Sequence, residues 1–294
     1  AGLDASPVLL STRENGLPGK LNPILTQFNY VVGRLDIGDS SFLLDATDPY
    51  LPFGMLPPRC LNGQGRWMPG GKDTSRWIDI RAGAQFSLSN FLELKMEGNG
   101  TFTGTITRIF RGYNALRKRK EIGGFNSPDE YMDDQQNKQH NIRILHYRID
   151  SLHNPDAPLT ITMKVEIDGS GNKDAGRLFI QPFIMDNLRE NPFKSAERTY
   201  PVDFGASMRT RNILVLEYPD NYEVVSVPKT TALGLPDDGG SYIMGAENVG
   251  NRLVIQSDLS LKKPVYPPEA YYSLKELYSR IIQIQNANVI FKRK

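Results

Sequence analysis

The chain has 294 residues, a length that predicts two domains. Hydrophobic residues make up 39% of the sequence, which is enough to bury a core and excludes a disordered tail. The formal net charge of +2, from 35 basic and 33 acidic residues, argues against a nucleic-acid-binding protein, which needs a concentrated positive field. No apolar run approaches the roughly 20 residues of a membrane span, and no signal peptide is recognised at the start of the sequence. Cys60 is the single cysteine, which excludes an intrachain disulfide and a multi-cysteine zinc site.

The first 75 residues predict a small β unit with long ordered loops. Strands are predicted at residues 8–10, 28–37 and 42–45. The last two are expected to form a hairpin around the turn Gly38-Asp39-Ser40. Prolines and glycines make residues 48–71 an irregular but ordered segment, and a domain boundary is predicted near residues 70–76.

Residues 76–294 predict an antiparallel β-sandwich that ends in one helix. Apolar and polar residues alternate strictly over 159–167, which is typical of a sheet with one buried and one solvated face. A hairpin is predicted around Glu97-Gly98-Asn99-Gly100. Strands are predicted at 91–96, 101–110, 142–149, 159–167, 177–181, 212–216, 222–227, 253–261 and 289–291.

Two polar or periodic segments predict helices in the same part of the chain. Residues 111–141 are polar and charged, and we expect a short amphipathic helix followed by a mobile loop. Pro267-Pro268-Glu269 is a good helix start, and apolar residues recur at helical spacing from there to Gln285. We therefore expect a C-terminal helix that ends near residues 286–288.

Asp45 is the first candidate functional residue, because it closes the apolar strand 42–45. A carboxylate at a strand end can orient a catalytic base. The following residues, Ala46-Thr47-Asp48-Pro49, also make a good turn, which an aspartate commonly caps. On the residues alone, the structural role is favoured.

The sequence around Asp45 resembles that of a known family. Residues 28–32 and 42–49 resemble the second half of a bacterial transglutaminase-like (papain-type) core, where Phe-Asn-His-Val is followed by a strand, a turn and Leu-Asp-Ala-Thr-Asp. Residues 7–13 and 52–57 are also similar to that family. The resemblance implies a cysteine nucleophile, a histidine that activates it and an aspartate that orients the histidine. Asp45 matches the aspartate, and Tyr30 stands at the position of the histidine.

Two departures from this pattern predict that the triad is not intact. Tyr30 offers a phenol in place of an imidazole, and phenols are too weakly basic to activate a thiol near neutral pH. The family's nucleophile precedes its histidine, but no cysteine precedes Tyr30, and Cys60 lies after Asp45. Tyr30 and Asp45 are then triad remnants. Asp45 is expected to bond near Tyr30 or to cap the turn.

Residues 76–294 resemble the C-terminal β domain of unknown function that follows such cores in Bacteroidetes-type proteins, most closely at 198–205 and 266–271. The expected fold is mainly β: a partial transglutaminase-like core over 1–75, a strand pair with loops, packed on an antiparallel β-sandwich with a C-terminal helix. The resemblance implies a C-terminal fragment of an exported protein, located in the periplasm or outside the cell.

Metal and cofactor sites are not expected. His140, His146 and His153 have no spacing of a ligand pair, so a metal site is disfavoured. Residues 168–172 have the composition of a calcium loop, but no glutamate closes them and a plain hairpin turn is favoured. No cofactor is predicted.

Two further features have a structural and a functional interpretation. The basic run 117–120 could contact an acidic partner, although a solvated helix face is favoured. Trp67 and Trp77 flank the expected boundary, where packing between the two domains is favoured over stacking on a sugar.

Three functions remain open from the sequence. The leading hypothesis is a non-catalytic accessory module of an exported transglutaminase-like protein, which binds a protein or cell-envelope partner through its edges and loops. The second is a fragment of an active cysteine acyltransferase or protease whose nucleophile lies upstream. The third is a carbohydrate-binding sandwich, suggested by aromatic residues such as Tyr271 and Tyr272.

Overall fold

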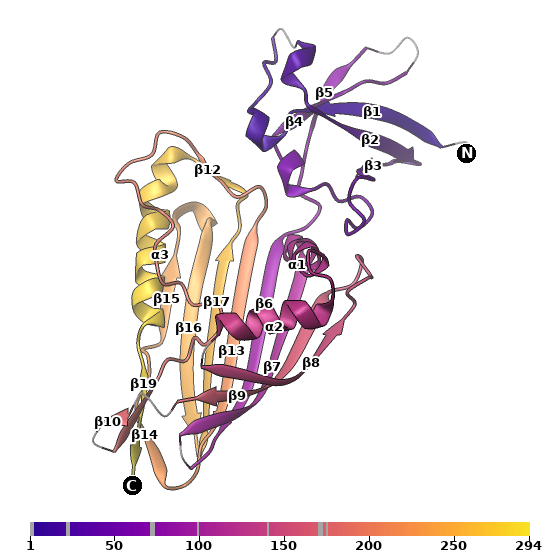
Figure 1. Ribbon diagram of the computed structural model, residues 1–294. Coiled ribbons are helices and arrows are strands. Elements are labelled where there is room, and N and C mark those ends of the chain that lie inside the picture. Colours follow the sequence, from indigo (N-terminus) through magenta and orange to yellow (C-terminus); the bar gives the residue numbers. More distant parts are fainter. Residues whose placement is uncertain are drawn as a thin grey trace.

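Within the part of the chain that the computed structural model describes, the strands form four sheets (Figure 1). The described residues are 3–21, 24–70, 74–98, 100–139, 141–169, 173–174 and 176–294. The expected fold class, mainly β with antiparallel sheets and a C-terminal helix, is confirmed. None of the helices in these residues has the length and apolarity that a membrane span requires.

The N-terminal sheet has five strands in the order β3-β2-β1-β4-β5, and every neighbouring pair is antiparallel. The strands are β1 Asp4–Leu10, β2 Tyr30–Ile37, β3 Ser40–Leu44, β4 Gln64–Trp67 and β5 Arg76–Asp79. The predicted hairpin is β2–β3, with Gly38 in the turn at a φ of 55°. The sequence patterns do not predict β4 and β5. Because β5 pairs with β4, this sheet extends to Asp79.

One face of the N-terminal sheet is buried under the irregular segment predicted at 48–71. The core between them comprises Val8, Leu10, Val32, Met55, Leu56, Cys60, Leu61, Trp67 and Ile80. The segment includes a single turn of 3-10 helix, Pro58–Cys60. Gly65 in β4 cannot be larger, because a Cβ there would lie 2.4 Å from Leu10 and 2.7 Å from Val8.

The large sheet has eight strands in the order β15-β16-β17-β13-β6-β7-β9-β8. Its strands are β6 Phe86–Met96, β7 Thr101–Gly112, β8 Ile142–Asp150, β9 Leu159–Asp168, β13 Met208–Glu217, β15 Thr231–Gly234, β16 Gly240–Val249 and β17 Arg252–Leu261. The alternation predicted in β9 is confirmed, with Leu159, Ile161, Met163, Val165 and Ile167 buried. One neighbouring pair, β6–β13, is parallel, and the others are antiparallel.

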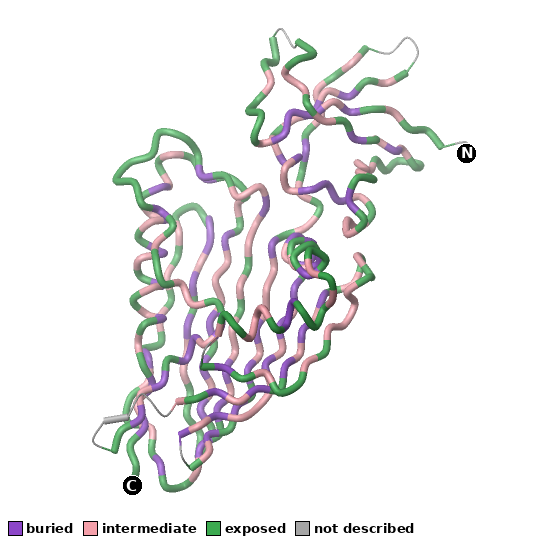
Figure 2. The backbone as a smooth tube through the Cα atoms, viewed as in Figure 1, coloured by how far each residue is buried: buried purple, intermediate pink, exposed green. Residues whose placement is uncertain are grey.

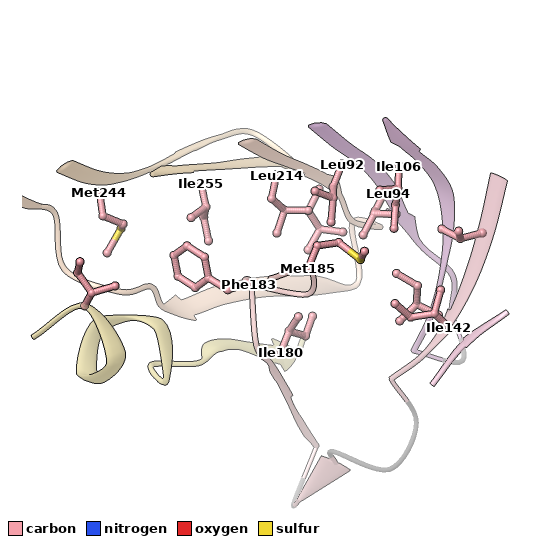
Figure 3. Close-up of a cluster of buried hydrophobic side chains, with 14 of the residues drawn as sticks. Leu92, Leu94, Ile106, Ile142, Ile180, Phe183, Met185, Leu214, Met244 and Ile255 are labelled. Carbon is pink, nitrogen blue, oxygen red and sulfur yellow. The ribbon is translucent and has the colours of Figure 1, made fainter. Parts of the chain in front are cut away.

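A second layer covers the buried face of the large sheet. It contains the predicted C-terminal helix, α3 Tyr271–Gln285, and the segment 181–201, which has no helix or strand. A smaller sheet in the order β10-β11-β19-β14 adjoins it, built from β10 Lys173–Asp174, β11 Arg177–Ile180, β14 Tyr222–Ser226 and β19 Val289–Arg293. Phe183 and Met185, which belong to segment 181–201, pack against side chains of the large sheet (Figure 3). A two-stranded sheet pairs β12 Val202–Asp203 with β18 Val265–Tyr266.

The prediction for residues 111–141 is wrong in its second half. The segment forms two helices, α1 Tyr113–Gly123 and α2 Pro128–Lys138, instead of one helix and a mobile loop. Ser127 caps α2, since its Oγ accepts a hydrogen bond of 3.1 Å from the backbone N–H of Glu130. The pattern Ser127-Pro128-Asp129-Glu130 is a recognisable helix start, so this helix was predictable from the sequence.

Two ionic contacts join the N-terminal sheet to the rest of the protein. Arg13 Nη1 donates to Asp203 Oδ1 at 2.8 Å, and Arg13 also donates to the carbonyl oxygen of Leu61. Lys120 Nζ lies 2.6 Å from Asp48 Oδ2, and the Asp48 side chain is 3% exposed. Buried side chains from both parts share one hydrophobic cluster, so the two parts pack directly together. Figure 2 marks the buried residues of each part in purple.

A row of polar side chains crosses the buried face of the large sheet at one register level. From β17 to β7 the row consists of Ser257, Asn212, Asn90 and Arg108. Asn90, which is fully buried, donates to Asn212 Oδ1 at 2.8 Å and accepts from Arg108 Nε at 3.0 Å. Asp186 of segment 181–201 accepts from Asn90 at 3.0 Å and pairs with Arg108. The row therefore fastens this segment to the middle of the sheet.

Replacing Asn90 by leucine should lower the free energy of unfolding by about 1–3 kcal/mol, because Arg108 and Asn212 each lose a hydrogen bond to a fully buried side chain. Urea unfolding followed by circular dichroism measures the change. Ser89→Ala is the control, since neighbouring strand residues point to opposite faces, and it should cost less than about 0.5 kcal/mol. Equal stabilities for Asn90→Leu and the wild type would contradict a stabilising role for the row.

Candidate functional site

Tyr30 and Asp45 lie together at one end of the β2–β3 hairpin. Tyr30 is the first residue of β2, and Asp45 directly follows β3. The antiparallel pairing of the two strands brings these ends side by side. Tyr30 Oη donates to Asp45 Oδ2 at 2.6 Å, and Asp45 Oδ1 accepts from the backbone N–H of Thr47 at 2.8 Å. Asp45 thus both bonds Tyr30 and caps the turn.

Arg59 and Thr47 complete the cluster, and the sequence analysis does not single out either of them. Arg59 Nη2 donates to Tyr30 Oη at 2.6 Å and to Thr47 Oγ1 at 3.1 Å. The guanidinium also lies over the Tyr30 ring, with Cζ 4.9 Å from the ring centroid. Its Nη2 atom lies 3.9 Å from Asp45 Oδ2. Arg59 lies in the 3-10 turn Pro58–Cys60. This turn is far from Tyr30 along the chain, so no local pattern predicts the contact between the two side chains.

The cluster holds Asp45 in its ionised form. The Asp45 side chain is 1% exposed, and burial alone would raise the pKa of its carboxyl. Hydrogen bonds from Tyr30 and Thr47 and the positive charge of Arg59 outweigh burial, so the pKa lies below the ordinary value. The hydrogen bond to Tyr30 is the main reason that the pKa of Arg59 is raised.

These contacts occupy the polar groups of the cluster. The proton of the Tyr30 hydroxyl is directed to Asp45, and the oxygen accepts from Arg59. Asp45 is ionised, and each of its oxygens accepts a hydrogen bond. The arrangement therefore orders the hairpin end and holds Arg59 in place.

Cys60 follows Arg59 directly and is 1% exposed. Burial raises the pKa of its thiol to about 11, although the charge of Arg59 opposes the rise. At neutral pH the residue is a protonated thiol inside the N-terminal core.

The other candidate residues do not assemble into a site. His146 and His153 are exposed, and His140 lies outside the described residues. Asp168 ends β9, and residues 170–172 of the suggested turn also lie outside them. Among the described residues, histidine, cysteine and acidic side chains form no group of three that could hold a metal ion.

The basic run 117–120 lies on α1, and the prediction of a solvated face is wrong for Arg119. The Arg119 side chain is almost fully buried, with the residue 1% exposed, and its guanidinium donates to the carbonyl oxygens of Ser151, Asn154 and Ala157. A buried guanidinium that binds only backbone oxygens has a structural role, which is to fix the loop 151–157.

The aromatic and cation–π contacts of Trp67 and Trp77 lie within the first 77 residues, and Trp67 also belongs to the buried cluster that both parts of the chain share. The guanidinium groups of Arg34 and Arg76 lie 3.9 and 4.1 Å from the Trp67 ring centroid. The Trp77 ring lies 6.0 Å from that of Phe28. These contacts stabilise the sheet to which both tryptophans belong.

The low pKa of Asp45 predicts a pH-dependent contribution to stability. A carboxyl whose pKa is depressed by folding stabilises the protein above its unfolded pKa of about 3.9 and loses that contribution as the pH falls through the folded pKa. The stability difference between the wild type and Asp45→Asn should therefore be constant above about pH 5 and shrink below about pH 4. Denaturant titrations across this range measure it, and Tyr30→Phe should reduce the effect. A difference that does not change with pH would contradict this description.

The raised pKa of Cys60 predicts a thiol that reacts slowly in the folded protein. Modification by a disulfide reagent at pH 8 should be much slower than in the urea-unfolded chain, because burial suppresses both thiolate formation and access. The rate should rise only as the pH approaches about 11. Rapid stoichiometric labelling of the folded protein at neutral pH would show that Cys60 is an activated thiol.

Two comparisons with known proteins relate to this fold. The family DUF3858, a domain of unknown function with a solved structure, matches residues 176–291. This range lies within residues 76–294, where the sequence resemblance implies a domain of unknown function. No curated protein matches the chain.

A crystal structure from Parabacteroides distasonis, described as a "putative protease", has a similar fold. The alignment has a TM-score of 0.51 and 9% sequence identity, and it covers 99% of this chain and 41% of that chain. The chain thus spans less than half the length of that structure. At this identity the similarity concerns the fold, and the chain shares a mainly β architecture with part of a longer protein.

Proposed function

We propose that this chain is a non-catalytic interaction module of a longer, exported transglutaminase-like protein. The observation that carries the proposal is the state of Tyr30, whose hydroxyl is bound between Asp45 and Arg59. In the family that the sequence resembles, this position holds the histidine that activates the thiol. A tyrosine fixed by two charged neighbours supports a structural use of the same position.

The properties of the Cys60 thiol also support a non-catalytic role. Cys60 is the single cysteine of the sequence, and it is buried beside the cluster with a raised pKa. A thiol of this kind is a weak nucleophile at neutral pH. The chain by itself therefore lacks both the nucleophile and the base of a cysteine acyltransferase, which supports the accessory hypothesis over the catalytic one.

Exposed apolar residues support an interaction role. Many of the large apolar side chains with high exposure belong to the N-terminal part, namely Leu3, Leu17, Leu21, Ile24, Leu25, Val31, Ile37, Phe53 and Met68. Val31 and Ile37 lie on β2 and are 57% and 51% exposed. A contact with another protein would remove these side chains from water.

The carbohydrate-binding hypothesis has less support. Tyr271 is 4% exposed, and its hydroxyl donates to the carbonyl oxygen of Ser195, whereas Tyr272 is 73% exposed. The two rings therefore do not form one aromatic platform on which a sugar could stack.

The cellular setting belongs to the same proposal. The resemblance to exported transglutaminase-like proteins supports a periplasmic or extracellular location and a partner in the cell envelope. The greater length of the Parabacteroides structure supports a parent protein with further domains.

An activity assay tests the proposal. The chain, and the natural protein that contains it, are incubated with a glutamine-rich protein and a fluorescent primary amine, and in parallel with a peptide substrate. We expect the chain itself to give no incorporation or hydrolysis above the buffer level, because its single thiol, Cys60, is buried with a raised pKa. Cys60→Ala should behave like the wild type, with thermal unfolding as the control for folding.

Product formation that is abolished by Cys60→Ala or Asp45→Ala would contradict the proposal and favour a catalytic role for this cluster. Activity of the longer protein that survives both substitutions would place the chemistry outside this chain and leave its accessory role intact.

A further inference from the structure

The large sheet has a second face, opposite to the one that α3, segment 181–201 and the smaller sheet cover (Figure 1). At the end of the sheet where β6 begins and β7 ends, this outer face carries three exposed arginines, Arg111, Arg209 and Arg211. We propose that these arginines bind a phosphate monoester group. The inference goes beyond the proposed function and does not depend on it.

The alternation of side chains along the strands assigns the arginines to the outer face. Asn212 and Arg108 belong to the polar row on the covered face. Arg209 and Arg211 are each an odd number of residues away from Asn212, and Arg111 is an odd number of residues away from Arg108. Since successive side chains of a strand point to opposite faces, all three arginines lie on the outer face.

The register of the strands places the arginines around one serine. Arg209 on β13 is paired with Ser87 on β6, and Ser87 is paired with Arg111 on β7. The two arginines therefore stand two strand spacings apart, about 9.5 Å, with the serine between them. Arg211 follows Arg209 on the same face and is paired with Ser89. Because serine is short, a small anion above Ser87 would lie between the longer arginine side chains.

Asp258 on β17 holds Arg209 and Arg211 in position. Its carboxylate accepts from Nε and Nη2 of Arg209 at 3.0 and 2.6 Å, and from Nε and Nη2 of Arg211 at 3.2 and 3.1 Å. Burial acts to raise the pKa of the Asp258 carboxyl, but the hydrogen bonds and charges of the two arginines hold it below its ordinary value. The carboxylate is therefore ionised, and guanidinium groups fixed by it lose less side-chain entropy when they bind a further anion.

The contacts within the chain leave many donors of the arginines unused. Arg209 and Arg211 each bond to Asp258 through Nε and Nη2, and in the described part of the chain no acceptor bonds to their Nη1 atoms. Among the same residues, the side chain of Arg111 has no hydrogen bond or ion pair, and the hydroxyl of Ser87 has no hydrogen-bond partner. An anion at this place would therefore find donors that no other group occupies.

The charges at this end of the outer face do not cancel. Asp258 is shared by two of the three arginines, so its single negative charge leaves an excess of two positive charges. Two further acids, Asp237 and Asp238, lie in the turn before β16, on the far side of β17 from the arginines, and Asp238 is paired with Lys262. The arginine side chains 209 and 211 are 46% and 45% exposed, so their charges are accessible to a ligand.

The excess charge selects the class of anion. A phosphate monoester carries a charge of about −1.5 to −2 near pH 7 and three strong acceptor oxygens, which match the excess charge and the unused donors. A sulfate monoester or a phosphodiester carries a single negative charge. A carboxylate also carries one, and Asp258 already supplies a carboxylate to Arg209 and Arg211. The cluster is therefore matched best by a phosphate monoester.

Phenyl phosphate and phenyl sulfate test this selectivity, because they have similar shapes and differ in charge. Each is titrated into the whole chain at low ionic strength, where exposed charges are screened least, and isothermal titration calorimetry measures binding. Phenyl phosphate should bind saturably, and phenyl sulfate about tenfold more weakly. Equal binding of the two esters would overturn the assignment to a phosphate monoester.

Arg111→Gln is the decisive variant, because its side chain has no partner to lose among the described residues. The variant should bind phenyl phosphate about tenfold more weakly, while its thermal unfolding stays unchanged. Arg252→Gln is the matched control, since Arg252 is an exposed arginine on the same face as Asp258, at the other end of β17. It should bind like the wild type. Unchanged binding by Arg111→Gln, or an equal loss in both variants, would overturn the site.

Vesicles distinguish a lipid headgroup from a soluble phosphate ester. Co-sedimentation compares phosphatidylcholine vesicles that contain phosphatidic acid, a phosphate monoester, with vesicles that contain phosphatidylglycerol, a phosphodiester. Preferential binding to phosphatidic acid that Arg111→Gln weakens would assign the site to a lipid headgroup. Binding of phenyl phosphate without binding to vesicles would assign it to a soluble ester.

Two outcomes of these assays would overturn the proposal. One is the absence of binding to both phenyl phosphate and the vesicles, and the other is equal binding to the two kinds of vesicle, which would reflect net charge alone. Each result is independent of the activity assay, so failure of the phosphate site and failure of the proposed function can be told apart.

Discussion

A sheet eight strands wide with one apolar face must be covered, and this constraint organises most of the molecule. Helix α3, the segment 181–201 and the smaller sheet supply the cover. The segment forms no β-ladder, so it depends on specific contacts, of which the ion pair between Asp186 and the buried Arg108 is central. At the far end, Arg13 bonds to Asp203, and the covering layer is thereby linked to the N-terminal sheet.

The cluster around Tyr30 surrounds a nearly buried carboxylate with a phenol and a guanidinium. Asp45 stands at the end of its strand and accepts a hydrogen bond from Tyr30. The phenol accepts Arg59 as a second partner, and the guanidinium balances the buried carboxylate. The result is an ionic hydrogen-bonded unit that stabilises the hairpin end.

Local patterns predicted those elements whose periodicity is set by burial. The alternation in β9 and the helical spacing of α3 follow directly from one buried face. The short strands β4 and β5 were not predicted, because their formation depends on pairing with residues that are distant in the sequence. In the site, the spacing of Tyr30 and Asp45 along one hairpin could be read from the chain. Arg59 could not, because its contact arises from the path of the covering segment, and neither could the burial of Arg119.

The central claim is that the Tyr30 hydroxyl is committed to Asp45 and Arg59, and proton NMR of protein with labelled tyrosine tests it most directly. The structure predicts a Tyr30 hydroxyl proton that exchanges slowly with water and is lost as a slow signal in Asp45→Asn. Tyr200, which is 77% exposed, provides the fast-exchanging reference in the same sample. A Tyr30 hydroxyl proton that exchanges as fast as that of Tyr200 would contradict the account.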